Sequence, residues 1–150
     1  MEKYSTQASA QILKFRWLDA QCIQIKLPNG KVILCDPFFP SETYPWKIDD
    51  KNAELYYLDQ PFSVEDLKQV DYVIINHTHG DHILKLEEIF QMYHPTVIIH
   101  SAMAEGLART HEIWLSSIYP VDLNGDYHFD GFTLHTFHGT HHPVRYSFSE

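Results

Sequence analysis

Apolar positions in the first quarter of the chain fall in short runs of strand length. Residues 12–17, 22–27 and 31–35 are rich in β-branched and aromatic side chains, which favour extended structure. Asn29-Gly30 stands between the second and third runs, and this dipeptide is typical of a tight hairpin turn. We therefore expect the chain to open with consecutive antiparallel strands.

Helical and extended patterns alternate in the middle of the chain. A serine followed by acidic residues gives residues 63–69 the pattern of a short helix. Apolar residues recur at helical spacing over 83–93, which predicts an amphipathic helix that ends before Pro95. The β-branched runs at 72–76 and 96–100 predict strands on either side of that helix.

The last third of the chain returns to strands after one more helix. Residues 102–110 have a helical pattern, and strands are expected at 118–123, 127–129 and 132–137, separated by Asn-Gly and Asp-Gly turns. Strands at both ends with helices between them predict a layered α/β or α+β fold. We expect one domain over residues 1–150, in which helices cover a mixed sheet.

Composition narrows the class of partner. The formal net charge is −9 and no run of Lys or Arg occurs, so neither a nucleic-acid partner nor an anionic membrane is expected. The N-terminus lacks the apolar core of a signal peptide, and no apolar run approaches the roughly 20 residues that span a bilayer. We expect a cytoplasmic protein with a small-molecule substrate and with Cys22 and Cys35 as reduced thiols.

A cluster of ligand-type side chains follows the predicted strand at 72–76. The cluster consists of His77, His79, Asp81 and His82, and all 11 histidines of the chain lie at or beyond His77. Alternate residues of an extended segment point the same way, so His77 and His79 are expected to face one cation. Asp81 and His82, where the chain turns into the helix, can reach a second position nearby.

These residue types predict a metal site. A single histidine in a polar turn would be better interpreted as a surface residue, but this spacing favours metal ligands. Zn²⁺ is the first choice, the same ligands admit Mn²⁺ or Fe, and one or two ions are expected. A metal-activated water is the usual nucleophile of hydrolases with such sites, and Asp81 is placed to orient it or take its proton.

The sequence at residues 77–82 resembles the His-x-His-x-Asp-His motif of the metallo-β-lactamase superfamily. Residues 15–37, which end in Asp36-Pro37, are similar to the opening strands of these proteins. Among the branches, the resemblance is greatest to the group that includes ascorbate-6-phosphate lactonase and related metal-dependent hydrolases. It implies an αββα sandwich, with Asp36 as a carboxylate that lies under the metal ligands without touching the metal.

The same resemblance implies a third histidine ligand near the end of the chain. In the family, a Gly-Asp pair and a Gly-led strand precede this ligand, and here they lead to the segment 138–142. His141 is the first choice for the third ligand of the first metal. His138 and His142 are alternatives that spacing does not separate.

The sequence departs from the family after His142. Family members continue to an aspartate that bridges two metals and to a late histidine, and neither has a counterpart here. The resemblance therefore implies a domain that lacks its C-terminal portion, with an incomplete second metal position. A sheet face left uncovered in this way would be expected to pair with a second copy or a complementary chain.

Two classes of function follow from the sequence. The preferred hypothesis is a metal-dependent hydrolase that acts on an ester, a lactone or a phosphoester, with an anionic substrate among the options. The alternative is a catalytically incomplete metal-binding or assembly module that needs a second chain or copy. A redox role with iron is permitted by the ligand set, but nothing in the sequence argues for its flavin or persulfide partner.

Overall fold

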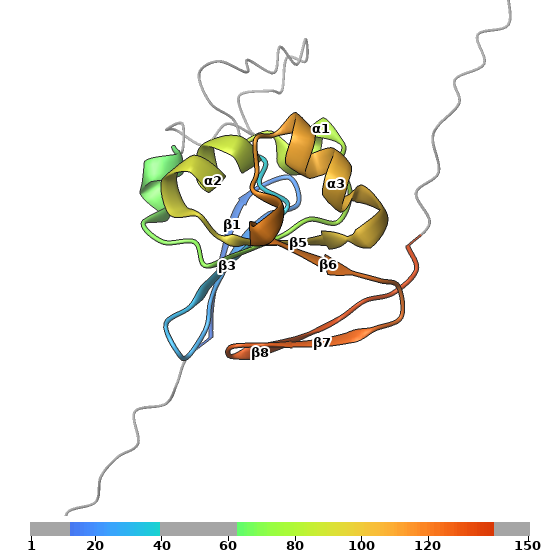
Figure 1. The fold of residues 1–150 in the computed structure, drawn as a ribbon. Helices are drawn as coiled ribbons and strands as arrows, with labels where there is room; N and C mark the ends of the chain where they lie inside the picture. Colours follow the sequence, from blue (N-terminus) through green and yellow to red (C-terminus); the bar gives the residue numbers. More distant parts are fainter. Residues whose placement is uncertain (1–12, 40–62, 140–150) are drawn as a thin grey trace, which may run out of the picture.

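A six-stranded mixed sheet forms the centre of the protein (Figure 1). The computed structural model describes residues 13–39 and 63–139. The strands are β1 (Lys14–Asp19), β2 (Cys22–Lys26), β3 (Val32–Cys35), β4 (Tyr72–Ile74), β5 (Thr96–His100) and β6 (Ile118–Val121), and they lie side by side in this order. The first three pair antiparallel and β3 to β6 pair parallel. The predicted opening meander and mixed sheet are therefore confirmed.

Helices cover one face of the sheet, and a hairpin crosses the other face (Figure 1). The helical elements are η2 (Val64–Leu67), α1 (Gly80–Ile83), α2 (Leu86–Tyr93), α3 (Ser101–Thr110) and η3 (Leu115–Ser117). The hairpin consists of β7 (Asp126–Phe129) and β8 (Phe132–His135), which form a separate two-stranded sheet. This layered arrangement is the α/β class that the sequence predicts.

Two predicted helices differ from the observed elements. The helix expected over 63–69 is a single 3-10 turn, and the helix expected over 83–93 is divided into α1 and α2. The division occurs at Lys85, whose backbone N–H donates to the carbonyl of Pro37 at 2.9 Å instead of continuing α1. The loop that follows β3 thus ends α1 after one turn, and α1 starts early enough to include Asp81 and His82.

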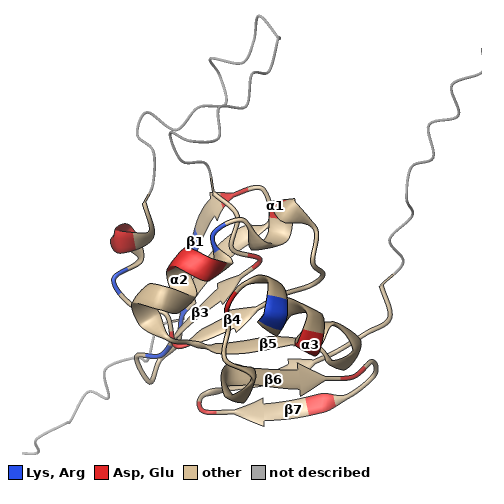
Figure 2. Cartoon of the chain, turned by 45° about the horizontal axis from the view of Figure 1, so that its top comes forward, with Lys and Arg blue, Asp and Glu red and all other residues tan. Residues whose placement is uncertain are grey.

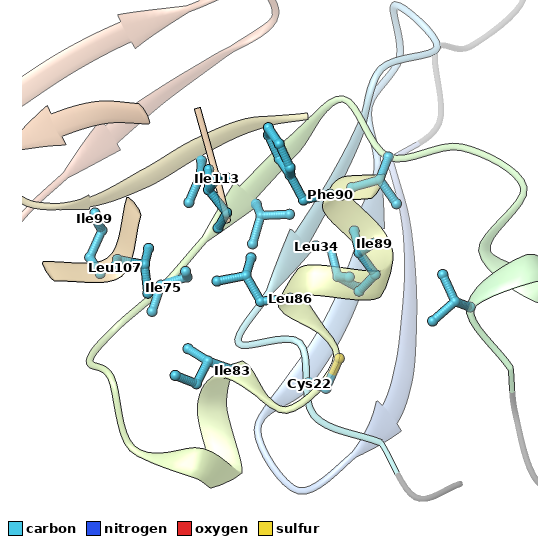
Figure 3. Close-up of a cluster of buried hydrophobic side chains, with 14 of the residues drawn as sticks. Cys22, Leu34, Ile75, Ile83, Leu86, Ile89, Phe90, Ile99, Leu107 and Ile113 are labelled. Atoms are coloured by element: carbon cyan, nitrogen blue, oxygen red, sulfur yellow. The ribbon is translucent and has the colours of Figure 1, made fainter. Parts of the chain in front are cut away.

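The core lies between the sheet and α2 (Figure 3). Leu34, Val73 and Val97 come from the central strands, and each is completely buried. Leu86 and Ile89 meet them from α2, where the spacing of three residues places both on one face of the helix. Burial of each such side chain contributes about 1.5–3 kcal/mol, so this contact fixes α1 and α2 against the sheet.

Aromatic packing and a polar contact hold the β7–β8 hairpin across the sheet. The ring of Tyr72 in β4 lies 5.7 Å from Phe129 and 5.1 Å from Phe132, centroid to centroid. At the hairpin tip, the Asn29 side chain donates to the backbone and side chain of Asp130, both at 3.2 Å. Gly131 has a φ of +94°, and a Cβ there would lie 2.4 Å from the Asn29 amide nitrogen. The hairpin therefore has one fixed course, in which β8 ends near the carboxyl ends of the parallel strands.

Both cysteines are free thiols, as expected from the sequence. Burial raises the pKa of Cys22 to about 12 and that of Cys35 to about 11. The two side chains are therefore neutral at physiological pH and serve as packing residues.

Charged residues of the described part of the chain are interspersed rather than gathered by sign (Figure 2). Lys85 pairs with Glu88 on α2 at 2.8 Å, and Arg109 pairs with Glu105 on α3 at 3.1 Å. Within residues 13–39 and 63–139, no helix combines the length and the apolar character that crossing a bilayer requires.

Asp71 directly precedes β4 and makes hydrogen bonds to the first residues of β3 and β5. One carboxylate oxygen accepts from Lys31 Nζ at 2.9 Å and the other from the backbone N–H of Val32 at 2.8 Å. Its backbone carbonyl accepts from Thr96 at 3.0 Å. Burial raises the pKa of Asp71, but the hydrogen bonds from Lys31, Val32 and Gln69 outweigh it and hold the pKa below its ordinary value.

We expect Asp71→Asn to lower the free energy of unfolding by about 1–2 kcal/mol at pH 7, because it removes charge-assisted hydrogen bonds. A folded-state pKa below the unfolded value stabilises the protein above the unfolded pKa, and this stabilisation is lost as pH falls through the folded pKa. The difference between variant and wild type, measured by urea unfolding, should therefore shrink below about pH 4. Glu105→Gln, which breaks an exposed pair, is the control and should leave stability unchanged. A deficit that stays constant down to pH 2 would contradict the assignment.

Candidate metal centre

The predicted ligand cluster lies where β4 ends and α1 begins. His77 is in the connecting loop, His79 is the N-cap residue of α1, and Asp81 and His82 are in its single turn. The carboxyl ends of the parallel strands β3, β4 and β5 meet at this edge of the sheet. Such an edge is where ligands bind in open α/β sheets.

Three imidazoles of this cluster share one small volume. The ring centroids of His77 and His82 are 3.9 Å apart, and those of His77 and His79 are 4.5 Å apart. His82 is buried, whereas the side chain of Asp81 is 53% exposed. The loop therefore presents imidazole nitrogens next to a carboxylate that solvent and substrate can reach.

Asp36 supports this cluster from the neighbouring strand end. It follows β3 with a φ of +44°, and its carboxylate is buried. One carboxylate oxygen accepts from the backbone N–H of Asn76 at 2.8 Å, and the other lies 3.1 Å from Nδ1 of His82. The second contact is close in distance but is not aligned as a hydrogen bond, so it is an electrostatic contact. Asp36 thus lies under His82, where the resemblance places it, and its role toward a metal stays a prediction.

Gln21 contacts the cluster from the turn between β1 and β2. Its side-chain nitrogen donates to Asp81 Oδ2 at 3.1 Å and lies 2.7 Å from Nε2 of His82. With the Gln21 amide nitrogen as the donor, Nε2 of His82 is the acceptor, which places the ring proton on Nδ1, on the side of Asp36. His82 therefore directs the lone pair of Nε2 away from Asp36, in the tautomer that a metal ligand needs.

Asp81 is ionised at neutral pH. Burial raises the pKa of its carboxyl group, but the hydrogen bond from Gln21, its own backbone N–H and the nearby rings of His82 and His77 lower it by more. The net pKa lies below the ordinary value for aspartate. The carboxylate is thus available as a ligand or as a proton acceptor.

The third histidine ligand is not settled by the described residues. His138 is exposed, and His141 and His142 lie outside the described residues. Phe137 and Asn76, which directly precede His138 and His77, both line one pocket. Across the described ranges, no three or more His, Cys, Asp or Glu side chains are placed so that together they could hold a metal ion.

The donor chemistry of the cluster is nevertheless that of a divalent metal site. Imidazole nitrogens and carboxylate oxygens are the ligands of Zn²⁺ and are also accepted by Mn²⁺ and Fe²⁺. His82 Nε2 and Asp81 Oδ2 converge on the Gln21 amide nitrogen, and two acceptors that meet at one donor would also attract a cation. Sequence reasoning missed Gln21 because it belongs to no motif and reaches the cluster only through the fold.

Known proteins share this sequence pattern. A family model described as a β-lactamase superfamily domain matches residues 14–147. A UPF0173 metal-dependent hydrolase of Staphylococcus carnosus is 28% identical over 102 residues, which cover 68% of this chain and 36% of that protein. Another, of Thermodesulfovibrio yellowstonii, is 32% identical over 76 residues, which cover 51% of this chain and 24% of that protein. The chain thus spans about a third, or less, of the length of these relatives.

A solved structure has a similar fold. Igni18, described as a novel metallo hydrolase from the hyperthermophilic archaeon Ignicoccus hospitalis, aligns with a TM-score of 0.50 and 18% identity. The alignment covers 77% of this chain and 42% of that one. At this identity the likeness concerns the fold alone, and it agrees with the predicted metallo-β-lactamase-like architecture.

Asp36→Asn tests the support of His82. In the variant, the side-chain oxygen of the new asparagine can still accept from the backbone N–H of Asn76. Its NH₂ group then faces Nδ1 of His82, which favours the ring proton on Nε2 instead of Nδ1. We therefore expect zinc affinity to fall by about 10- to 100-fold, measured by competition with a chromogenic chelator. Asp130→Asn, at the hairpin tip, is the control. Equal affinities of wild type and Asp36→Asn, with circular dichroism unchanged, would show that Asp36 does not orient a ligand.

Proposed function

Because the chain belongs to the β-lactamase superfamily domain family, we propose that it is a metal-dependent hydrolase that uses a metal-activated water on an ester, a lactone or a phosphoester. The observation that carries this proposal is the packing of His77, His79 and His82 beside the accessible carboxylate of Asp81. The relatives named as metal-dependent hydrolases support the reaction class.

The metal would be held by residues of two segments. His77 and His79, with His141 as the first choice among the late histidines, would hold one ion, and Asp81 with His82 would hold a second. Zn²⁺ is the ion that we propose. When bound, it would polarise the carbonyl or phosphoryl oxygen of the substrate and lower the pKa of water to about 7.

The residues of the chain itself orient groups and move a proton. The carboxylate of Asp36 lies 3.1 Å from Nδ1 of His82, where its charge favours a proton on Nδ1 and leaves Nε2 as an acceptor. Asp81 is ionised and half exposed, and it can take a proton from water that approaches from the open side. Gln21 donates to both Asp81 and His82 and so holds their relative orientation until a cation replaces its amide.

A second candidate function is supported by a different surface. Phe15 and Trp17 belong to β1, and their side chains are 66% and 63% exposed. Both lie on the face of the sheet that is opposite the helices. An exposed aromatic pair of this kind is typical of a contact surface. The chain could therefore be a metal-binding module that assembles with a second copy or a complementary chain instead of turning over a substrate.

Hydrolysis by the zinc- or manganese-loaded chain distinguishes the two candidates. We expect turnover of 4-nitrophenyl acetate, a simple lactone or bis(4-nitrophenyl) phosphate above the rate in buffer. Asp81→Asn should lower kcat by about 10²- to 10⁴-fold, because it removes the proton acceptor. Glu105→Gln, an exposed carboxylate on α3, should leave the rate unchanged. If loaded wild-type protein gives no rate above buffer with any of these substrates, the hydrolase proposal is lost and the assembly module remains.

A further inference from the structure

A pocket of about 390 Å³ opens beside the candidate metal centre. Its walls are the carboxyl ends of β3, β4, β5 and β6 together with the end of β8. Asp36 and Asn76 connect the pocket with the cluster. Both line the pocket, and they are hydrogen-bonded to each other next to His82. The volume is in the usual range for small-molecule sites, about 300–1,000 Å³.

Most of the pocket wall is apolar. Ile74 and Ile98 form the floor on the sheet, Val121 and Leu123 follow β6, and Leu134 comes from the hairpin. Ile98 is fully buried beneath this space. A wall of this kind favours an aliphatic or aromatic group, because each buried methylene improves binding by about fourfold.

The electrostatics of the pocket disfavour an anion. Among the described residues, no Lys or Arg lines the pocket, whereas Asp36 and Asp122 do. The polar side chains of the β6–β8 wall are engaged with the protein itself: Ser101 donates to the Asp122 carboxylate at 2.5 Å, and Thr136 donates to the carbonyl of Asp122 at 2.6 Å. In the chain without bound metal, a negatively charged ligand group would meet the negative charge of Asp36 and Asp122 in this pocket.

His100 lines the pocket and carries a hydrogen-bond donor. It ends β5, and its Nδ1 accepts from the backbone N–H of Ala102 at 3.2 Å as the N-cap of α3. In a neutral imidazole, one nitrogen accepts and the other carries the proton, so Nε2 of His100 is a donor. The ring thus offers an N–H to an acceptor such as a carbonyl oxygen.

We propose that this pocket binds the apolar acyl part of a neutral carbonyl substrate, with His100 as a donor to an oxygen of that substrate. The inference rests on the proposed function, because it takes the ligand of the pocket to be the molecule that is hydrolysed. Within the ester, lactone and phosphoester classes, it selects acyl esters and lactones with an aliphatic or aryl chain over phosphoesters.

Binding is tested first on the chain without added metal, so that the result does not depend on catalysis. Butanamide and hexanamide are neutral, unreactive probes, and hexanoate matches hexanamide in chain length but carries a charge. We expect hexanamide to shift the backbone amide signals of Asn76, Leu123 and Thr136 in ¹⁵N–¹H NMR spectra. Its Kd should be about tenfold or more below that of butanamide, following about fourfold per methylene. Hexanoate should bind at least tenfold more weakly than hexanamide.

Substitution of His100 tests whether its ring N–H donates to the ligand. Asn is a good N-cap residue, so His100→Asn keeps the cap of α3 but removes the ring N–H. We expect it to weaken hexanamide binding by about threefold to tenfold, the effect of one hydrogen bond. His111→Asn, at the far end of α3, is the matched control and should bind as wild type does. Unchanged binding in His100→Asn would overturn the role of His100.

Two results would overturn the pocket itself: hexanoate binding as tightly as hexanamide, or no shifts at the three named amides. Hydrolysis separates this proposal from the proposed function. With 4-nitrophenyl esters from acetate to hexanoate, kcat/KM of the zinc-loaded chain should rise with chain length. If kcat/KM is independent of chain length, the proposed role of the pocket is wrong, whereas the hydrolase proposal stands. If hexanamide binds but no ester is hydrolysed, the hydrolase proposal is wrong, whereas the pocket stands as a binding site.

Discussion

The contact between Asp36 and His82 depends on the parallel pairing of β3 with β4. Parallel neighbours end at the same edge, so residues that follow the two strands are brought together although they are far apart in sequence. The result is a buried carboxylate 3.1 Å from Nδ1 of His82, whose charge favours a proton on that nitrogen and leaves Nε2 as the acceptor for Gln21. The candidate ligand set, the pocket beside it and the proposed chemistry all depend on this alignment of strand ends.

Packing far from the cluster maintains that alignment. Leu86 and Ile89 anchor α2 against the central strands, and α1 is joined to α2 through Lys85, whose N–H bonds the loop after Asp36. The hairpin β7–β8 is held at its tip by Asn29 and along its length by aromatic rings, so the chain arrives at His138 beside the same strand ends. The site is therefore assembled from segments whose positions are set by the core.

Elements with strong periodicity were predictable from the sequence, and contacts between distant segments were not. The Asn29-Gly30 turn, the strands and α3 follow from local patterns that the fold does not override. The break at Lys85 depends on a hydrogen bond to Pro37, which no local pattern records. In the site, the motif at 77–82 predicted the histidine cluster, and the resemblance predicted a carboxylate at Asp36. Gln21 and the pocket at His100 emerged only when the turn after β1 and the ends of four strands were placed in space.

The central claim is that His77, His79 and a histidine of the segment 138–142 bind one ion. X-ray absorption at the zinc edge, on the chain loaded with one equivalent of Zn²⁺, measures this coordination directly. We expect at least three imidazole nitrogens at about 2.0–2.1 Å from the zinc, and fewer in the His77→Ala/His79→Ala variant. A shell of oxygen ligands alone, the same in wild type and variant, would contradict it.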